Sequence, residues 1–477
     1  MAKLIERLER ILEREAFTWG IHPVPRERRA LSGLDLAVLW GDLSVGFLVM
    51  VTGALLVPAL GLPLALLAIV VGTAIGCLAL ALVGLAGERE GVPGMVLFRP
   101  VLGLRGSFLP SALNVLQLVG WTAVEFWAIA QVANVVSRRL FGFDSYGLWL
   151  VVVSVVCTGL ALGGPILVVR RWLERFGIYL LVASAAWITL KVLSAGDLGV
   201  IWHRPGEGGL PFWLAVDLVV VMPISWLPLA ADYNRFAKSA ARGFAGTYWG
   251  YAVGNVWFYA LGALLVLSVG ASADVVGIGL SISAVAGGAI VLVALLVGES
   301  DNAFADIYSS AVSIQNVWSR APQRWLILGI GVVSFGLARF LSVGRYEVFL
   351  LLIGSVFVPL FGVFAADYFV RHRGRYGEVE LFAPTGLHGL ALIPWAVGFV
   401  LYHWSVPTGP RGWIDAMRTL FHGWLHLPFP LLGSRLGASI PSFFAAFLLA
   451  LLILHAAPRR EASGTARDDV PPTRPID

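Results

Sequence analysis

The chain has 477 residues, of which 58% are hydrophobic and 13% are charged, and its mean hydropathy is +0.82. Soluble domains carry about 25% charged residues, so this composition excludes a soluble protein and indicates a membrane protein with many spans. The formal net charge is +5, but the basic residues are spread over loops between apolar runs. That distribution is a topology signal and excludes a nucleic-acid-binding patch.

Residues 1–34 are hydrophilic and are expected to form a cytoplasmic segment with a short amphipathic helix around residues 4–12. This hydrophilic stretch precedes the first apolar run, so no cleavable signal peptide is expected. Counting apolar runs of about 20 residues predicts an all-α protein with twelve membrane spans. Their approximate ranges are 36–60, 62–86, 108–136, 147–169, 176–195, 212–231, 246–270, 286–316, 325–342, 346–370, 388–406 and 438–457.

The distribution of Lys and Arg predicts the orientation of these spans. If the N-terminus is cytoplasmic, 25 of the 34 basic residues fall on cytoplasmic segments, as the positive-inside rule requires. Exceptions such as Arg138, Arg139 and Arg411 are too few to reverse the assignment. An even number of spans returns the C-terminus to the cytoplasm, where residues 459–477 have the composition of a disordered tail.

Two spans contain residues that interrupt a helix. The first carries Gly41 and Ser44 within the sequence LWGDLSVG, and the sixth carries Pro223 and Pro228. Irregular backbone at membrane depth is tolerated where it lines a cavity, and a pair of interrupted helices in corresponding positions is typical of a transporter binding site. The alternative is a pair of ordinary kinks, since Gly and Pro are common in membrane helices.

The third span carries a polar stripe. Asn114, Gln117, Trp121 and Glu125 follow one another at helical spacing and share one face. An aromatic ring one turn from a carboxylate suits a flat heterocycle, which needs a surface to stack on and an acceptor at its edge. Alternatively, these side chains could hydrogen-bond to a neighbouring helix.

The stretch of residues 290–317, which contains most of the eighth span, carries the strongest functional signal. Glu299, Asn302 and Asp306 lie on one helical face, and Ser300 and Asp301 begin the neighbouring face. A carboxylate at membrane depth costs at least about 2.5–3.5 kcal/mol, so these groups are expected to face a cavity or a partner. The alternative is that they mark a helix end within the lipid headgroups.

Motifs of enzymes and ATP-driven pumps are absent from the sequence. It contains no HExxH, GxSxG or GxxxxGK[ST], and Cys77 and Cys157 have no metal-binding spacing. We therefore expect no enzymatic activity, no cofactor, and an ion gradient as the source of energy for any transport. A channel would need repeated filter elements, and none is visible.

Several motifs resemble the nucleobase:cation symporter family, and within it the bacterial hydroxymethylpyrimidine permease (CytX-like) branch. They are GIHPVPRERR before the first span, WGDLSVGFLVMVTGALLVPALGLP, GVPGMVLFRPVLGLRGSFLP, NVLQLVGWTAVE and SWLPLAADYNRFAKS. The resemblance covers nearly all twelve spans. It implies a LeuT-type core of two inverted five-helix repeats at 35–371, two additional helices at 372–458, and a multi-pass protein of the bacterial inner membrane with both termini cytoplasmic.

The resemblance also implies a site. Trp121 and Glu125 match the family's substrate-holding pair on helix 3, and Ser300, Asp301, Asn302 and Asp306 match its helix 8 run. Asp301 replaces a hydroxyl ligand of sodium, so it could serve sodium or a proton. The expected substrate residues are Trp121, Glu125, Trp226, Asp306, Asn302 and Gln117, and the expected cation ligands are Asp301, Ser300, Gly41 and Ser44.

The sequence therefore predicts a secondary transporter that imports a pyrimidine, with hydroxymethylpyrimidine, a precursor of thiamine, as the first candidate. Its expected partners are the substrate, a coupling cation (Na⁺, or H⁺ as the alternative) and the lipid bilayer. The main alternative is a cytosine, purine or allantoin/hydantoin permease of the same fold, and a channel or membrane enzyme is a weaker one.

Overall fold

The computed structural model describes residues 19–163, 178–285, 287–341, 346–382, 386–431 and 435–456. Within these ranges the chain is helical, and the bridge between Leu31 and Ala237 is an isolated pair rather than part of a strand. In chain order the helices are η1 (Arg26–Arg28), α2 (Gly33–Asp42), α3 (Phe47–Ala54), α4 (Leu62–Glu90), α5 (Gly94–Leu97), α6 (Arg99–Leu102), α7 (Phe108–Phe141), α8 (Tyr146–Gly163), α10 (Ile178–Ala195), α11 (Leu198–His203), α12 (Phe212–Asn234), α13 (Ala240–Val269), α14 (Val275–Ala284), α15 (Gly288–Val317), α16 (Gln323–Phe340), α17 (Tyr346–Ala365), η3 (Ala366–Arg371), α18 (Glu378–Phe382), α19 (Gly389–Ser405), α20 (Arg411–Arg418), η4 (Thr419–Trp424) and α21 (Ser439–Ala456).

A helix or a bent pair of helices occupies each of the twelve expected spans, which confirms the all-α prediction. Among the described residues, seven helices are long and apolar enough to cross a membrane, or eight if the bent pair α2–α3 counts as one span, and α10, α19 and α21 are shorter. The facing ends of the fourth and fifth spans lie outside the described residues. The expected N-terminal amphipathic helix and the C-terminal tail also lie outside them.

The two spans predicted to be interrupted behave differently. The first is broken as expected, because α2 and α3 meet at an angle of 60°. The sixth is one continuous helix, α12, which contains both Pro223 and Pro228. Each proline removes only one backbone donor, and the surrounding helices bury nearly all of α12, so its helical path survives.

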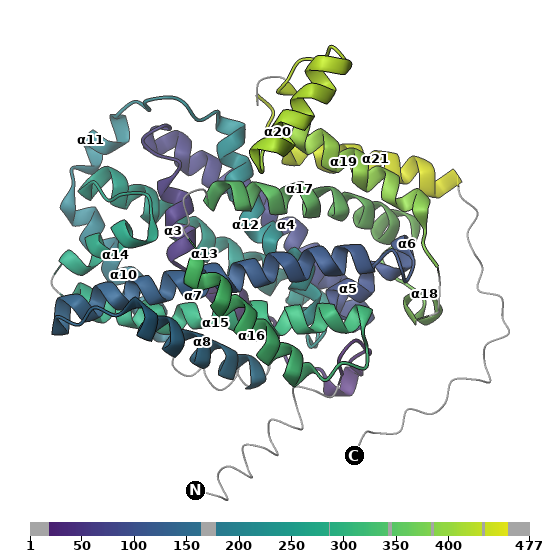
Figure 1. The fold of residues 1–477 in the computed structure, drawn as a ribbon, viewed down its shortest axis with the longest axis horizontal. Helices are drawn as coiled ribbons and strands as arrows, with labels where there is room; N and C mark the ends of the chain where they lie inside the picture. The colour runs from purple at the N-terminus through teal and green to yellow at the C-terminus, as the bar shows by residue number, and fades with distance from the viewer. Residues whose placement is uncertain are drawn as a thin grey trace, which may run out of the picture.

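The helices form one bundle, in which α12 lies between α4 and α17, α7 runs along α15, and α13 packs on α2, α3 and α4. Figure 1 shows α19 and α21 beside α17, with α20 projecting from the bundle. Small residues allow the closest approaches. A Cβ at Gly53 of α3 would lie 2.0 Å from the Tyr259 carbonyl oxygen of α13, so only glycine permits this contact.

A buried carboxylate joins the last helix to the core. Asp217 of α12 is 2% exposed and accepts hydrogen bonds from the backbone N–H groups of Ala438 and Ser439, at the start of α21. The N-terminus of a helix leaves such donors unsatisfied and carries a partial positive charge, so a carboxylate fits there. The contact fixes α21 against α12.

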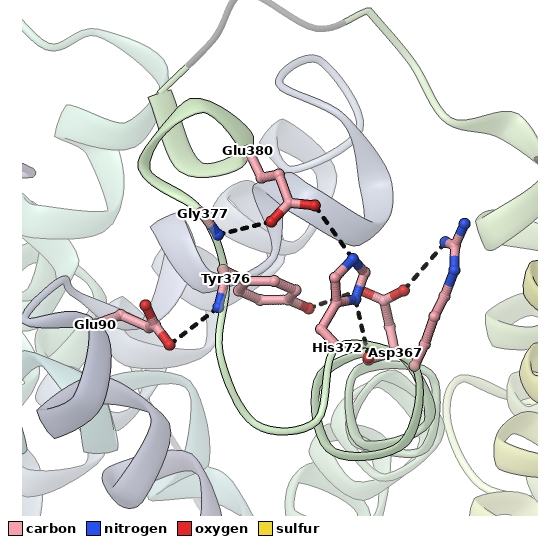
Figure 2. A network of polar contacts seen from close by, with 7 residues as sticks. Glu90, Asp367, His372, Tyr376, Gly377 and Glu380 are labelled. Atoms are coloured by element: carbon pink, nitrogen blue, oxygen red, sulfur yellow. Dashed lines mark hydrogen bonds and ion pairs between the residues drawn. The ribbon is translucent and has the colours of Figure 1, made fainter. Parts of the chain in front are cut away.

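A polar network fastens the segment after η3 to the end of α4 (Figure 2). Tyr376 donates from its hydroxyl group to Asp367 (2.7 Å) and from its backbone N–H to Glu90 (3.1 Å). His372 lies 3.3 Å from Asp367 and 3.2 Å from Glu380. Burial lowers the pKa of His372, but hydrogen bonds and charge from Asp367 and Glu380 outweigh burial and raise that pKa to about 10. The imidazolium therefore holds two carboxylates together at this end of the bundle.

Candidate functional site

A small cavity lies where α7, α12 and α15 meet the break in the first span. The residues of its lining come from all four elements and are Leu43, Leu48, Val49, Trp121, Glu125, Met222, Trp226, Glu299 and Asn302. Four of the six expected substrate residues are among them: Trp121, Glu125, Trp226 and Asn302. The close packing of α7 along α15 brings the stripes of the third and eighth spans to the same cavity.

Trp121 and Trp226 supply the aromatic part of this lining, from α7 and α12. The Trp121 ring contacts Tyr346 and Phe349 edge-on, with centroids 6.0 and 5.2 Å apart. These two contacts fix the plane of the indole, while its Nε1 atom has no hydrogen-bond partner. A rigid ring with a free donor can stack on a flat ligand and bond to its edge.

Two carboxyl groups lie next to each other in the lining of the cavity. The side chains of Glu125 and Glu299 lie within hydrogen-bonding reach of each other, and both are at least 96% buried. Glu299 also accepts from the backbone N–H of Phe47 (3.3 Å), the first residue of α3. The sequence stripe contained Glu299, but it was not among the expected ligand residues; its position one turn before Asn302 on the same face was the available signal.

Gln117 was expected to bind substrate, but the structure gives its amide a different position. Its Nε2 atom donates to Asn114 (2.8 Å) and to the Ser225 carbonyl oxygen of α12 (3.0 Å), and Gln117 is not part of the cavity lining. Asn114 in turn donates to Ser313 of α15 (2.8 Å). This half of the stripe therefore links α7 to α12 and α15, the alternative that the sequence left open.

Asp306 is also absent from the cavity lining. It is 2% exposed and lies four residues beyond Asn302 on α15, in the turn that packs near Tyr233 of α12, whose hydroxyl group donates to the Ala305 carbonyl oxygen. Asp306 therefore lies behind the lining of the cavity, close enough to Glu125 to interact with it electrostatically.

The expected cation ligands divide into two sets. Ser300 and Asp301 are buried in α15, where the Ser300 hydroxyl group donates to the Leu296 carbonyl oxygen (3.1 Å). Gly41 and Ser44 instead face α13: the Ser44 hydroxyl group donates to the Gly41 carbonyl oxygen (2.7 Å), and a Cβ at Gly254 would touch both groups.

Asp42, at the break in the first span, interacts electrostatically with Asp301, although it is not among the cation ligands predicted from the sequence. In the described part of the chain, no three His, Cys, Asp or Glu side chains are grouped as a metal site. Any cation here would be held by a mixture of carboxylate, hydroxyl and carbonyl oxygens, the hard ligands that alkali cations prefer.

The sequence profile of a family described as "Permease for cytosine/purines, uracil, thiamine, allantoin" matches residues 23–418. The chain is 23% identical over 389 residues to the hydantoin permease of Microbacterium maritypicum, covering 77% of this chain and 78% of that protein. It is 25% identical over 406 residues to the allantoin permease of Bacillus subtilis (strain 168), covering 76% and 80%.

A solved structure of the nucleobase-cation-symport-1 family transporter MHP1, in a closed conformation with bromovinylhydantoin bound, superposes on this chain with a TM-score of 0.77. The identity is 20%, and the superposition covers 94% of this chain and 96% of MHP1. At this identity the likeness establishes the fold. It confirms the expected LeuT-type core of two inverted five-helix repeats.

Proposed function

The chain belongs to the family of permeases for cytosine/purines, uracil, thiamine and allantoin, and from that premise we propose that it imports an aminopyrimidine, with hydroxymethylpyrimidine as the first candidate. The relatives that it matches are permeases, so the chain is a membrane transporter and not an enzyme. The observation that carries the choice of substrate is the cavity in which Glu125 meets two tryptophans.

An aminopyrimidine presents an exocyclic amine and a ring nitrogen side by side. Glu125 can accept from the amine with one oxygen, while a proton on its other oxygen bridges to the ring nitrogen. When that proton moves to the ring nitrogen, both bonds become charge-assisted and about twice as strong as neutral ones, and together they fix the plane of the ring. Trp121, one helical turn away, would stack on the ring face and contribute on the order of 0.5–1.5 kcal/mol beyond burial.

In this proposal Asn302 binds the second edge of the ligand. The sequence predicts substrate binding by both Asp306 and Asn302, but Asn302 lines the cavity and Asp306 does not. The Asn302 Oδ1 atom has no hydrogen-bond partner, so it is free to accept from a hydroxymethyl group. Trp226 closes the cavity from α12.

Coupling in this proposal uses a cation at α15 and the break in the first span. Ser300 and Asp301 supply a hydroxyl group and a carboxylate, and Asp42 adds a second carboxylate from the break. Sodium favours such hard oxygens, and a proton on Asp301 is the alternative. The positive-inside rule places both termini in the cytoplasm, so substrate and cation would enter from the opposite side of a bacterial inner membrane.

Binding to the purified protein tests the proposal. We expect isothermal titration calorimetry to detect hydroxymethylpyrimidine binding, and Glu125→Gln to weaken it at least tenfold, about 1.4 kcal/mol. Glu207→Gln is the matched control, because this exposed side chain pairs with Arg204 in a loop away from the cavity. Unchanged affinity in a folded Glu125→Gln protein would show that the α7 stripe serves only to link helices.

The alternative substrates of the family are tested in the same titrations. Cytosine, a purine, allantoin and hydantoin should each bind more weakly than the aminopyrimidine. Concentrative uptake into proteoliposomes under an imposed sodium gradient, compared with an imposed proton gradient, then identifies the coupling ion. A protein that binds none of these compounds, or that never accumulates any of them, would contradict the proposed function.

A further inference from the structure

Among the polar atoms around the cavity that lack a hydrogen-bond partner, acceptors outnumber donors. Three of these four atoms are acceptors: Glu125 Oε2, Glu299 Oε1 and Asn302 Oδ1. Trp121 Nε1 is the donor. The side chain of Asn302 also interacts with Glu299, and its Oδ1 atom is the one without a partner. A buried polar group left without a partner is destabilising, and a bound ligand can supply the missing partner.

Glu299 is held rigidly among these groups. Its Oε2 atom accepts from the backbone N–H of Phe47 (3.3 Å), and Asn302 bonds to the same carboxyl group. Gly46 provides the space that this arrangement needs, because a Cβ there would lie 2.5 Å from Glu299 Oε1. Glu299 therefore lines the cavity with one oxygen bound to the broken helix and with its Oε1 atom without a partner.

The protein supplies few donors to satisfy this arrangement. Among the described residues, no Lys, Arg or His lines the cavity. The two most deeply buried guanidinium groups in that part of the chain bond elsewhere, Arg99 to Asn316 and Arg235 to Gly20 and Tyr308. Two ionised carboxylates have no hydrogen to share, so either one proton or a donor from the ligand must lie between Glu125 and Glu299.

We infer that Glu299 is a second ligand-binding carboxyl group and that the cavity selects heterocycles with hydrogen-bond donors on the edge that faces Glu125 and Glu299. This inference rests on the proposed function and gives a chemical reason for its substrate class: the ring must be amino-substituted or protonated. The ring nitrogen beside the amine of an aminopyrimidine can take up the shared proton and become a donor, whereas the ring imides uracil and hydantoin place carbonyl oxygens, which stay acceptors, next to their N–H groups. A carbonyl oxygen set against a carboxylate leaves both acceptors unpaired, a mismatch that buried polar sites reject strongly.

The test measures selectivity rather than affinity alone. The full-length protein is titrated with 4-amino-5-hydroxymethyl-2-methylpyrimidine, uracil and hydantoin, in wild type, Glu299→Gln and Glu207→Gln. The amide in Glu299→Gln keeps the size of the side chain but replaces one acceptor with a donor. We expect the ratio of aminopyrimidine affinity to uracil affinity to fall at least tenfold in Glu299→Gln and to stay at the wild-type value in Glu207→Gln.

Two further variants distinguish a specific effect of the Glu299 carboxyl group from a general folding defect. Glu299→Asp keeps the carboxyl group and should retain more of the selectivity than Glu299→Gln does. Gly46→Ala displaces the carboxyl group without changing its charge, and should shift the ratio in the same direction as Glu299→Gln. Each variant is compared with wild type by its melting temperature and its elution as a single species.

The outcomes separate this inference from the proposed function. Wild-type protein that binds uracil or hydantoin as tightly as the aminopyrimidine would overturn the inference. It would not contradict the assignment of the chain to the permease family. An unchanged affinity ratio in folded Glu299→Gln would also overturn it. Wild-type protein that prefers an aminopurine to every pyrimidine would support donor selection but refute the proposed substrate.

Discussion

Replacing Asp217 with Ala should detach the start of α21 from the core. The substitution removes the acceptor for two buried backbone N–H groups, those of Ala438 and Ser439. Each orphaned donor costs about 1–3 kcal/mol. The two sites are adjacent and share one partner, so their costs do not add fully, and we expect a local destabilisation of about 3 kcal/mol.

Hydrogen exchange followed by mass spectrometry measures this opening directly. A destabilisation of about 3 kcal/mol corresponds to a roughly hundredfold loss of protection in the peptide that covers residues 436–442, while peptides of α4 and α7 keep theirs. Asp217→Asn keeps one acceptor and should lie between wild type and Asp217→Ala. Asp274→Ala is the matched control, since Asp274 accepts from Gly277 at the exposed start of another helix, α14. Wild-type protection of residues 436–442 in Asp217→Ala would refute the reasoning.

Two other predictions concern the cation and the polar network of Figure 2. Asp301→Asn should reduce gradient-driven uptake in proteoliposomes much more than Asp301→Glu does, because only the second keeps a carboxylate ligand; equal losses would argue against a charged ligand. His372 has a folded-state pKa of about 10, above its usual 6.5, so its contribution to stability is complete below about pH 6.5 and is lost as the pH rises toward 10. Thermal melts from pH 6 to pH 10 should therefore fall more steeply for wild type than for His372→Gln, and parallel curves would contradict this.

The positions of the spans could be read from the sequence because hydropathy is a local property. Each run of about 20 apolar residues must cover the hydrocarbon core, and the structure has a helix in every one. The break near Gly41 was predictable for the same reason, since it rests on residues adjacent in the chain. The continuity of α12 was not, because whether a proline interrupts a helix depends on the neighbours that bury it.

For the polar stripe of the third span, the sequence predicts the helix face but not the partner of each side chain. Helical periodicity placed Asn114, Gln117, Trp121 and Glu125 on one face, and it offered two interpretations of that face. The structure divides the stripe between them: Trp121 and Glu125 line the cavity, while Asn114 and Gln117 bond to Ser313 and Ser225. Periodicity fixes the direction of a side chain around its own helix, but the partner at each level depends on the neighbouring helices.

The contact between Glu299 and Phe47 joins two features that the sequence presented separately. A broken helix exposes backbone N–H groups at the start of its second half, and these groups carry a partial positive charge. A carboxylate buried in a membrane needs such donors. Glu299 and Phe47 are 252 positions apart, so no local pattern shows that they meet. In the structure the backbone N–H of Phe47 supplies the donor that the buried carboxylate needs, and Glu299 supplies the acceptor that this N–H group needs. The carboxyl group is left with one oxygen for Glu125 or for a ligand. Movement of α3 against α15 would change that hydrogen bond and the shape of the cavity together, which is how a transporter can link substrate binding to the opening of the broken helix.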